Sequence, residues 1–221
     1  MKTMLSWSSG KDSAWALGVL RDDPDIELCG LFTTINEAFD RVAMHAVRRE
    51  LVEAQARAAG LPLSTIDIPF PCPNEVYAQR MGAFVDDARC HGVEAMAFGD
   101  LYLADIRSYR ERMLAGTGMT PLFPLWGRDT GQLARTMIAA GLRAYVTCVD
   151  PNRLDAAFAG RSFDLDLLAA LPEGVDPCGE NGEFHTLAVA GPMFREEVYV
   201  RHGDIVSRDG FVFADFEAMA P

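Results

Sequence analysis

Cysteine pairs and long hydrophobic runs are missing from this 221-residue sequence. The five cysteines are scattered and none stands in a C-x-x-C pair, which argues against a disulfide framework or a zinc site. No apolar run approaches the roughly 20 residues that a membrane-spanning helix needs, and no signal peptide precedes the first strand-like segment. We therefore expect a compact cytoplasmic protein with no membrane partner.

Basic side chains are also scarce. Twenty lysines and arginines face 32 acidic residues, which gives a formal net charge of −12. Such a field repels polyanions unless a local basic patch overcomes it. The composition favours a small substrate over nucleic acid.

The first 126 residues alternate short apolar runs with amphipathic stretches, the pattern of a parallel sheet covered by helices. Strands are predicted over residues 3–7, 26–33, 63–68, 95–98 and 121–125. Apolar residues recur at helical spacing between them, among them Met44, Val47 and Leu51. The predicted fold class is therefore α/β, with helices on both faces of the sheet.

The second part of the chain has a different character. We predict a helix over 130–140, a strand over 144–149, and a Gly/Pro-rich loop over 171–182. The C-terminal segment predicts short hairpins with turns at 202–204 and 208–210. This part is expected to form a smaller α+β domain.

The loop Ser8-Ser9-Gly10-Lys11-Asp12-Ser13 lies between the first predicted strand and a helix over 14–20. Backbone N–H groups and the helix dipole converge at such a point and attract an anion. Gly10 permits close backbone approach, Lys11 can neutralise phosphate, and Asp12 can hold Mg²⁺. The motif is neither a Walker A loop nor a dinucleotide-binding fingerprint. The competing interpretation is that Asp12 or Ser13 merely caps the helix.

The loop resembles the S-G-G-K-D-S signature of the PP-loop, or N-type, ATP pyrophosphatases. It departs from that signature at Ser9, where Gly is usual, and a serine there is disfavoured if the loop needs a positive φ. The resemblance implies that ATP is bound here and cleaved between its α and β phosphates.

Three further segments narrow the resemblance to the diphthine ammonia ligase family. They are residues 99–110, residues 124–129 and the Cys178-Gly179-Glu180-Asn181-Gly182-Glu183-Phe184-His185-Thr186 run. The resemblance implies an N-terminal nucleotide-binding domain of the HUP type, residues 1–126, and a C-terminal substrate-binding domain, residues 127–221. It also implies ATP-dependent amidation, in which a small-molecule or protein-borne carboxylate is adenylated and then attacked by ammonia.

Candidate site residues follow from these segments. Asp100 comes after the fourth predicted strand, where ligands of open α/β sheets bind, although it could equally cap a helix. Glu183 and His185 are candidates for contact with ammonia. The predicted catalytic residues are Lys11, Asp100, Glu183 and His185. The predicted ATP contacts are Ser8, Ser9, Gly10, Lys11, Asp12, Ser13, Thr33, His45, Gly99 and Arg107, with Asp12 as the Mg²⁺ ligand. The predicted substrate contacts are Arg128, Glu180, Asn181, Gly182 and Glu183.

Two other functions remain open at this point. A tRNA-modifying PP-loop enzyme is disfavoured by the missing C-x-x-C pair and the negative charge. A non-catalytic adenine nucleotide-binding protein is disfavoured by the polar 178–186 segment, since a sensor needs no second substrate pocket. The sequence leaves a homodimer open.

Overall fold

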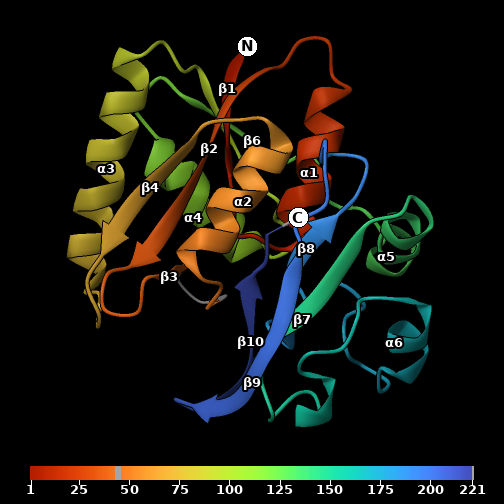
Figure 1. Cartoon of the computed structure of the whole chain (residues 1–221). Coiled ribbons are helices and arrows are strands. Elements are labelled where there is room, and N and C mark those ends of the chain that lie inside the picture. Colours follow the sequence, from red (N-terminus) through yellow and green to blue (C-terminus); the bar gives the residue numbers. More distant parts are fainter. Residues whose placement is uncertain (43–45, 221) are drawn as a thin grey trace.

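The computed structural model describes residues 1–42 and 46–220, and it contains two β-sheets (Figure 1). The first sheet uses only residues from the first part of the chain. Its strands are β1 (Lys2–Ser6), β2 (Glu27–Asn36), β3 (Arg41–Val42), β4 (Leu63–Ile68), β5 (Ala95–Ala97) and β6 (Thr120–Leu122).

The strands of this sheet lie in the order β4-β2-β1-β5-β6 and are parallel, while the short β3 pairs antiparallel with the end of β2. The chain builds outward from β1 in one direction, then returns to the other side of β1 with β5. Open α/β sheets bind ligands at the carboxyl ends of the strands where this reversal occurs. The topology therefore points to the loops after β1 and β5.

Helices cover both faces of the first sheet. The sheet residues Leu5, Leu31 and Ile35 pack with helices α1 (Lys11–Arg21) and α2 (Arg49–Ala59). The alternate residues Met4 and Phe32 face the opposite way and pack with α3 (Asn74–Cys90) and α4 (Ala104–Leu114). This arrangement confirms the predicted α/β fold. Among the described residues, no helix combines the length and the apolar character needed to cross a membrane.

The second sheet is antiparallel, in the order β8-β7-β10-β9. Its strands are β7 (Arg143–Val149), β8 (Phe184–Ala190), β9 (Val200–Arg208) and β10 (Phe211–Ala218), accompanied by α5 (Thr130–Ala139), the 3-10 helix η1 (Ala156–Phe158) and α6 (Leu165–Ala170). Figure 1 shows this sheet beside α1 and α2, and one hydrophobic core contains both Leu17 of α1 and Leu187 of β8. Along the sequence, the strands of the first sheet precede residue 126 and those of the second sheet follow it. The division into two domains at that point stays a prediction.

Three local predictions need correction. Residues 202–204 do not form a turn but lie inside β9, where Gly203 and Asp204 face the single residue Asp215 in a bulge. The close approach explains the glycine, because a Cβ at Gly203 would lie 3.2 Å from the Cβ of Asp215. Helix α2 begins at Arg49, later than the apolar pattern suggested, and Met44 lies outside the described residues. Strand β6 ends at Leu122, three residues before the predicted end of the strand at residue 125.

Candidate active site

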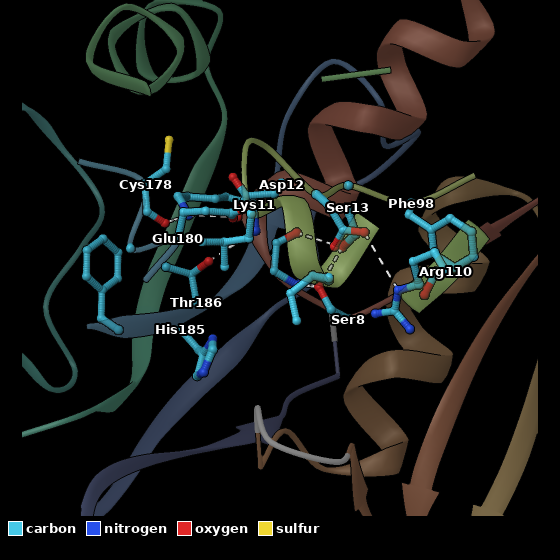
Figure 2. Close-up of a pocket in the computed structure, with 18 residues that line it drawn as sticks. Ser8, Lys11, Asp12, Ser13, Phe98, Arg110, Cys178, Glu180, His185 and Thr186 are labelled. Atoms are coloured by element: carbon cyan, nitrogen blue, oxygen red, sulfur yellow. Dashed lines mark hydrogen bonds and ion pairs between the residues drawn. The ribbon is translucent and has the colours of Figure 1, made fainter. Parts of the chain in front are cut away.

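A cavity of about 220 Å³ lies at the carboxyl end of the first sheet, between the loops that follow β1 and β5. Figure 2 shows that it is closed on its other side by the segment from Cys178 to Thr186. Three of the segments singled out in the sequence thus meet around one space.

The loop after β1 holds a strained residue. Ser9 adopts a φ of 72°, the left-handed conformation that glycine tolerates better than serine. Its carbonyl accepts hydrogen bonds from Gln55 Nε2 and from the Ala188 N–H, both at 2.9 Å, so α2 and β8 hold the strained turn in place. This geometry bears out the expectation that a serine at this position is disfavoured.

Helix α1 begins at Lys11 without a hydrogen-bonded side-chain cap. The Ser13 hydroxyl instead donates to the Gly10 carbonyl at 2.9 Å and accepts from the Ser8 hydroxyl at 3.2 Å. The competing interpretation, in which Asp12 or Ser13 only caps the helix, is therefore wrong. The positive end of the helix dipole faces the cavity, where it favours an anion.

Two glycines allow the surrounding loops to approach this helix start. A Cβ at Gly99 would lie 3.2 Å from the backbone of Asp12 and Ser13, and one at Gly10 would lie 3.3 Å from the Thr186 carbonyl oxygen. Contacts that close fall near the limit for real side chains, so glycine keeps all three segments together. The predicted role of Gly10 as a point of close approach fits this geometry, whereas Gly99 was predicted only as an ATP contact.

Lys11 is almost fully buried, with 1% of its surface exposed. Its ammonium donates to Asp12 Oδ2 at 2.9 Å and to the Cys178 carbonyl, and lies 5.4 Å from the centres of the Phe163 and Phe184 rings. Burial alone would lower the pKa of Lys11, but the charges of Asp12 and Glu180 offset this and its pKa is raised. The cavity therefore contains a permanent positive charge.

Three carboxyl groups line the cavity: Asp12, Asp100 and Glu180. Burial raises the pKa of all three, that of Glu180 to about 7, while Lys11 and Arg110 act in the opposite direction on the two aspartates. Asp12 Oδ1 and Asp100 Oδ2 are buried without a hydrogen-bond partner among the described residues. Buried oxygens of this kind are ligands for a hard cation such as Mg²⁺.

No group of three or more His, Cys, Asp or Glu residues forms a ready metal cage in the described chain. Mg²⁺ does not need such a group, because it usually takes one or two carboxylates and completes its shell with phosphate oxygens and water. Asp12 and Asp100 thus fit the ion, although the sequence analysis named only Asp12. Asp100 does not cap α4, whose N-cap is Leu103.

The C-terminal wall of the cavity includes two residues that the sequence analysis did not single out. The Thr186 hydroxyl accepts from the Lys11 backbone N–H at 3.0 Å, and the Cys178 carbonyl accepts from the Lys11 ammonium. Arg110 of α4, in the family-like segment 99–110, also lines the cavity, where its guanidinium lies 4.9 Å from the centre of the Phe98 ring and its Nε lies 3.7 Å from Asp100. Thr186 and Cys178 stand in the family-like segment, which was the only sequence signal for them.

His185 faces the same cavity. Burial, together with the charge on Lys11, lowers the pKa of its imidazole to about 4. The ring is therefore neutral at physiological pH and suited to hydrogen bonding rather than to proton transfer.

Several predicted residues lie outside the cavity. Glu183 is a buried residue of the 178–186 segment, and its Oε1 accepts from the Asp176 N–H at 3.1 Å and from Asn181 Nδ2 at 3.0 Å. Asn181 is exposed, and the neighbouring Gly182 adopts a positive φ of 86°. Both help to shape the turn rather than line the cavity.

Two predicted arginines also point elsewhere. Arg107 stacks on the rings of Phe123 and Trp126 and pairs with Glu111 on the surface of α4. Arg128 lines a separate surface hollow beside α5. Neither lines the cavity as the structure stands.

A second hollow of about 220 Å³ adjoins the cavity and shares Ser6, Ser8 and Arg110 with it. Thr33, at the end of β2, lines this hollow, as does its neighbour Thr34. The predicted ATP contact of Thr33 is compatible with that position. His45 lies outside the described residues.

The five parallel strands, the uncapped helix start and the S-S-G-K-D-S loop define an α/β protein of the PP-loop class. Comparison with known families gives a narrower assignment. Residues 1–121 match the diphthamide synthase N-terminal domain, and residues 129–215 match the diphthamide synthase C-terminal domain. The chain belongs to the diphthamide synthase family.

Curated relatives agree with this assignment. The chain is 26% identical over 237 residues to a diphthine–ammonia ligase of Rattus norvegicus, covering 94% of this chain and 85% of that protein. The human protein of the same name is 26% identical over 229 residues, with the same coverage. That of Danio rerio is 29% identical over 196 residues, covering 81% of this chain and 76% of the relative.

Proposed function

We propose that this protein is an ATP-dependent ligase that converts a carboxylate into an amide, with diphthine or a related carboxylate as acceptor and ammonia as the nitrogen source. The observation that carries the proposal is the buried Lys11 ammonium at an uncapped helix N-terminus, in a cavity closed by the family's 178–186 segment. The ligase names of the relatives favour this function over a tRNA-modifying or non-catalytic role.

The reaction has two steps in this proposal. An acceptor carboxylate oxygen attacks the α phosphorus of ATP, the bond to the bridging oxygen breaks, and pyrophosphate leaves. Ammonia then attacks the acyl carbon of the adenylate, AMP leaves with its oxygen, and the nitrogen loses a proton. ATP is thus divided into AMP and pyrophosphate.

The loop and the cavity supply phosphate binding. The α1 N-terminus and Lys11 offset the negative charge of the phosphates, and Ser8 presents a hydroxyl beside them. Asp12 and Asp100 would hold Mg²⁺, which supplies charge neutralisation to the phosphate oxygens when bound. Thr33 lines the adjoining hollow, where we place the nucleoside.

The C-terminal wall serves the second step. Glu180 lines the cavity with a pKa of about 7, so its carboxylate is suited to take up the proton released from ammonia. The neutral His185 can donate a hydrogen bond to the acceptor without adding charge. Glu183, which we had assigned to ammonia, instead supports this segment through Asp176 and Asn181.

All five cysteines are free, which supports a reducing cytoplasmic setting.

Product analysis tests the proposal. The protein is incubated with Mg²⁺, ammonium, an acceptor carboxylate and ATP labelled at both the α and the γ phosphate, and the labelled products are separated by chromatography. We expect AMP and pyrophosphate in equal amounts, dependent on the carboxylate. ADP as the sole nucleotide product would contradict the assignment, since the α–β bond would then have remained intact.

A further inference from the structure

One buried side chain of α2 contacts three other parts of the fold at once. Gln55 has no exposed surface, although an amide is costly to bury unless its hydrogen-bonding groups find partners. Its Oε1 accepts from the indole Nε1 of Trp7 at 2.9 Å, and its Nε2 donates to the carbonyls of Ser9 and Ala188 at 2.9 and 2.6 Å. The amide therefore connects α2 with the chain just after β1, with the loop there and with β8.

The partners of Gln55 fix the orientation of its amide. An indole N–H can only donate and a carbonyl can only accept, so the amide oxygen must face Trp7 and the amide nitrogen must face the two carbonyls. The opposite rotation of the amide would break all three contacts. An apolar residue of the same size would leave the buried Trp7 N–H without this acceptor. The position thus requires an amide.

The loop residue that Gln55 holds does not favour its own conformation. Ser9 is fully buried at a φ of 72°, where serine is disfavoured relative to glycine, and its hydroxyl has no hydrogen-bond partner among the described residues. Two hydrogen bonds to its carbonyl, from Gln55 and from the Ala188 N–H, oppose this cost. Removal of the bond from Gln55 should therefore let the loop relax toward a negative φ at Ser9.

The direction of the Ser9 carbonyl decides where the next N–H points. The Ser9–Gly10 peptide is trans and planar, so its carbonyl and the Gly10 N–H point in opposite directions. With that carbonyl held, the Gly10 N–H points to the Ser8 hydroxyl, which lines the nucleotide cavity between the loops after β1 and β5. This contact is 3.4 Å long, beyond the usual range, so the N–H keeps most of its capacity for a phosphate oxygen.

The residue on the other side of Gly10 is also anchored. The Lys11 backbone N–H donates at 3.0 Å to the hydroxyl of Thr186, which lies two residues before Ala188 in β8 (Figure 2). Gly10 therefore lies between two residues whose backbone groups are held, one by Gln55 and β8 together and the other by β8. An N–H group that is already in place binds an anion with less loss of loop freedom.

We propose that Gln55 is a positioning residue of the nucleotide site, which acts through the Ser9–Gly10 peptide to aim the Gly10 N–H at a phosphate of ATP. Gln55 lines neither the nucleotide cavity nor the adjoining hollow, so it acts without touching the ligand. The inference rests on the proposed function only in taking ATP as the anion. Its consequence is that a buried change on α2 alters phosphate binding and leaves nucleoside binding intact.

Calorimetry with two probes, ATP with Mg²⁺ and adenosine, tests this role. Gln55→Met keeps the length of the side chain and removes its donors. ATP affinity should fall by about tenfold, the effect of roughly one lost hydrogen bond to a charged group, while adenosine affinity stays unchanged. Val52→Ala, which removes buried apolar atoms from the same helix, is the matched control for lost stability and should leave both affinities unchanged.

A second substitution tests the step through the loop. Adding Ser9→Gly to Gln55→Met should recover about threefold or more of the ATP affinity, because glycine adopts a positive φ without the cost that serine has. Circular dichroism first shows which variants are folded. If Gln55→Met does not fold, Gln55→Asn, whose shorter side chain withdraws the amide from the loop, is measured in the same way.

Three results would each overturn the inference. They are unchanged ATP affinity in the folded Gln55 variant, an equal loss of ATP and adenosine affinity, and no recovery with Ser9→Gly. Each would show that the amide serves the fold and does not position the Gly10 N–H. Wild-type protein that binds ATP and forms no AMP with an acceptor carboxylate would instead contradict the proposed function and leave this inference in place.

Discussion

Two clusters of charged residues in this protein are built in opposite ways. In the nucleotide cavity, Asp12 and Asp100 each have one buried carboxyl oxygen with no hydrogen-bond partner among the described residues, and burial raises the pKa of each. The other cluster, which we call the arginine clamp, comprises Arg41, Arg48, Asp215 and Glu217.

In the arginine clamp every charge has a partner. Asp215 accepts from Arg41 at 2.7 Å and from Arg48 at 2.5 Å, and Arg48 also lies 3.5 Å from Glu217. Burial alone would raise the pKa of Asp215, but the hydrogen bonds from Arg48 and Arg41 hold it well below its usual range. The clamp joins β10 of the second sheet to β3 and the start of α2.

This difference in pairing distinguishes residues that stabilise the fold from residues that bind a ligand. Paired charges with a lowered carboxyl pKa favour the folded state, whereas buried carboxyls with a raised pKa cost stability and are kept where a ligand completes them. Removal of a residue from the cavity should therefore change ligand binding, and removal of one from the clamp should change folding.

The largest expected effect is that of Lys11→Ala. Loss of one charge-assisted contact to phosphate costs about 1.5 to 3 kcal/mol, so ATP affinity should fall roughly ten- to a hundredfold and turnover with it. Calorimetry with ATP measures the affinity. Lys2→Ala, at the other end of the adjacent strand, is the matched control and should bind ATP normally, because the Lys2 ammonium donates to the His91 carbonyl at the surface. Unchanged ATP affinity in Lys11→Ala would show that this cavity does not bind the nucleotide.

Asp215→Ala should act on stability instead. Two arginines lose their main partner in a partly buried setting, and we expect the free energy of unfolding to drop by about 2 kcal/mol, between the values for exposed and buried ion pairs. Urea denaturation monitored by circular dichroism measures this. Asp86→Ala, which breaks an exposed pair with Arg89 on α3, should cost no more than about 0.5 kcal/mol. A loss of ATP affinity in folded Asp215→Ala protein would break the division between the two clusters.

Sequence reasoning found the loop after β1 because its chemistry is local. A strand, a short polar loop and a helix follow one another in the chain, and backbone geometry alone then directs the helix start toward a ligand. The same holds for Gly99, which follows the next central strand. Parallel pairing brings the ends of β1 and β5 together, so their position at one edge was predictable.

The contacts that close the cavity were not predictable in the same way. Thr186 and Lys11 are 175 residues apart, and nothing in the spacing says that the hydroxyl meets that backbone N–H. Local orientation was equally hidden, since Glu180 faces the cavity while Glu183 turns beneath the same segment. Arg107 and Arg110 lie one turn apart on α4, yet only Arg110 faces the cavity, because Phe123 and Trp126 hold Arg107.

The sharpest comparison of the two clusters is the pH dependence that Glu180 adds to stability. Its pKa rises from 4.5 to about 7 on folding, mainly through burial, so between those values the folded state holds a proton that the unfolded state has released. The contribution of Glu180 to stability is therefore present below about pH 4.5 and is lost as the pH rises toward 7. Asp215 changes stability with pH in the opposite direction, because its pKa is lowered and its contribution is lost only as the pH falls.

Glu180→Gln, measured without metal or nucleotide, should unfold with a free energy that decreases less between pH 4.5 and 7 than that of the wild type. The difference between the two proteins should grow steadily across this range. Parallel stability curves for the two proteins would show that the Glu180 carboxyl titrates in the folded chain as it does in water, and the contrast between the cavity and the clamp would then rest on Asp12 and Asp100 alone.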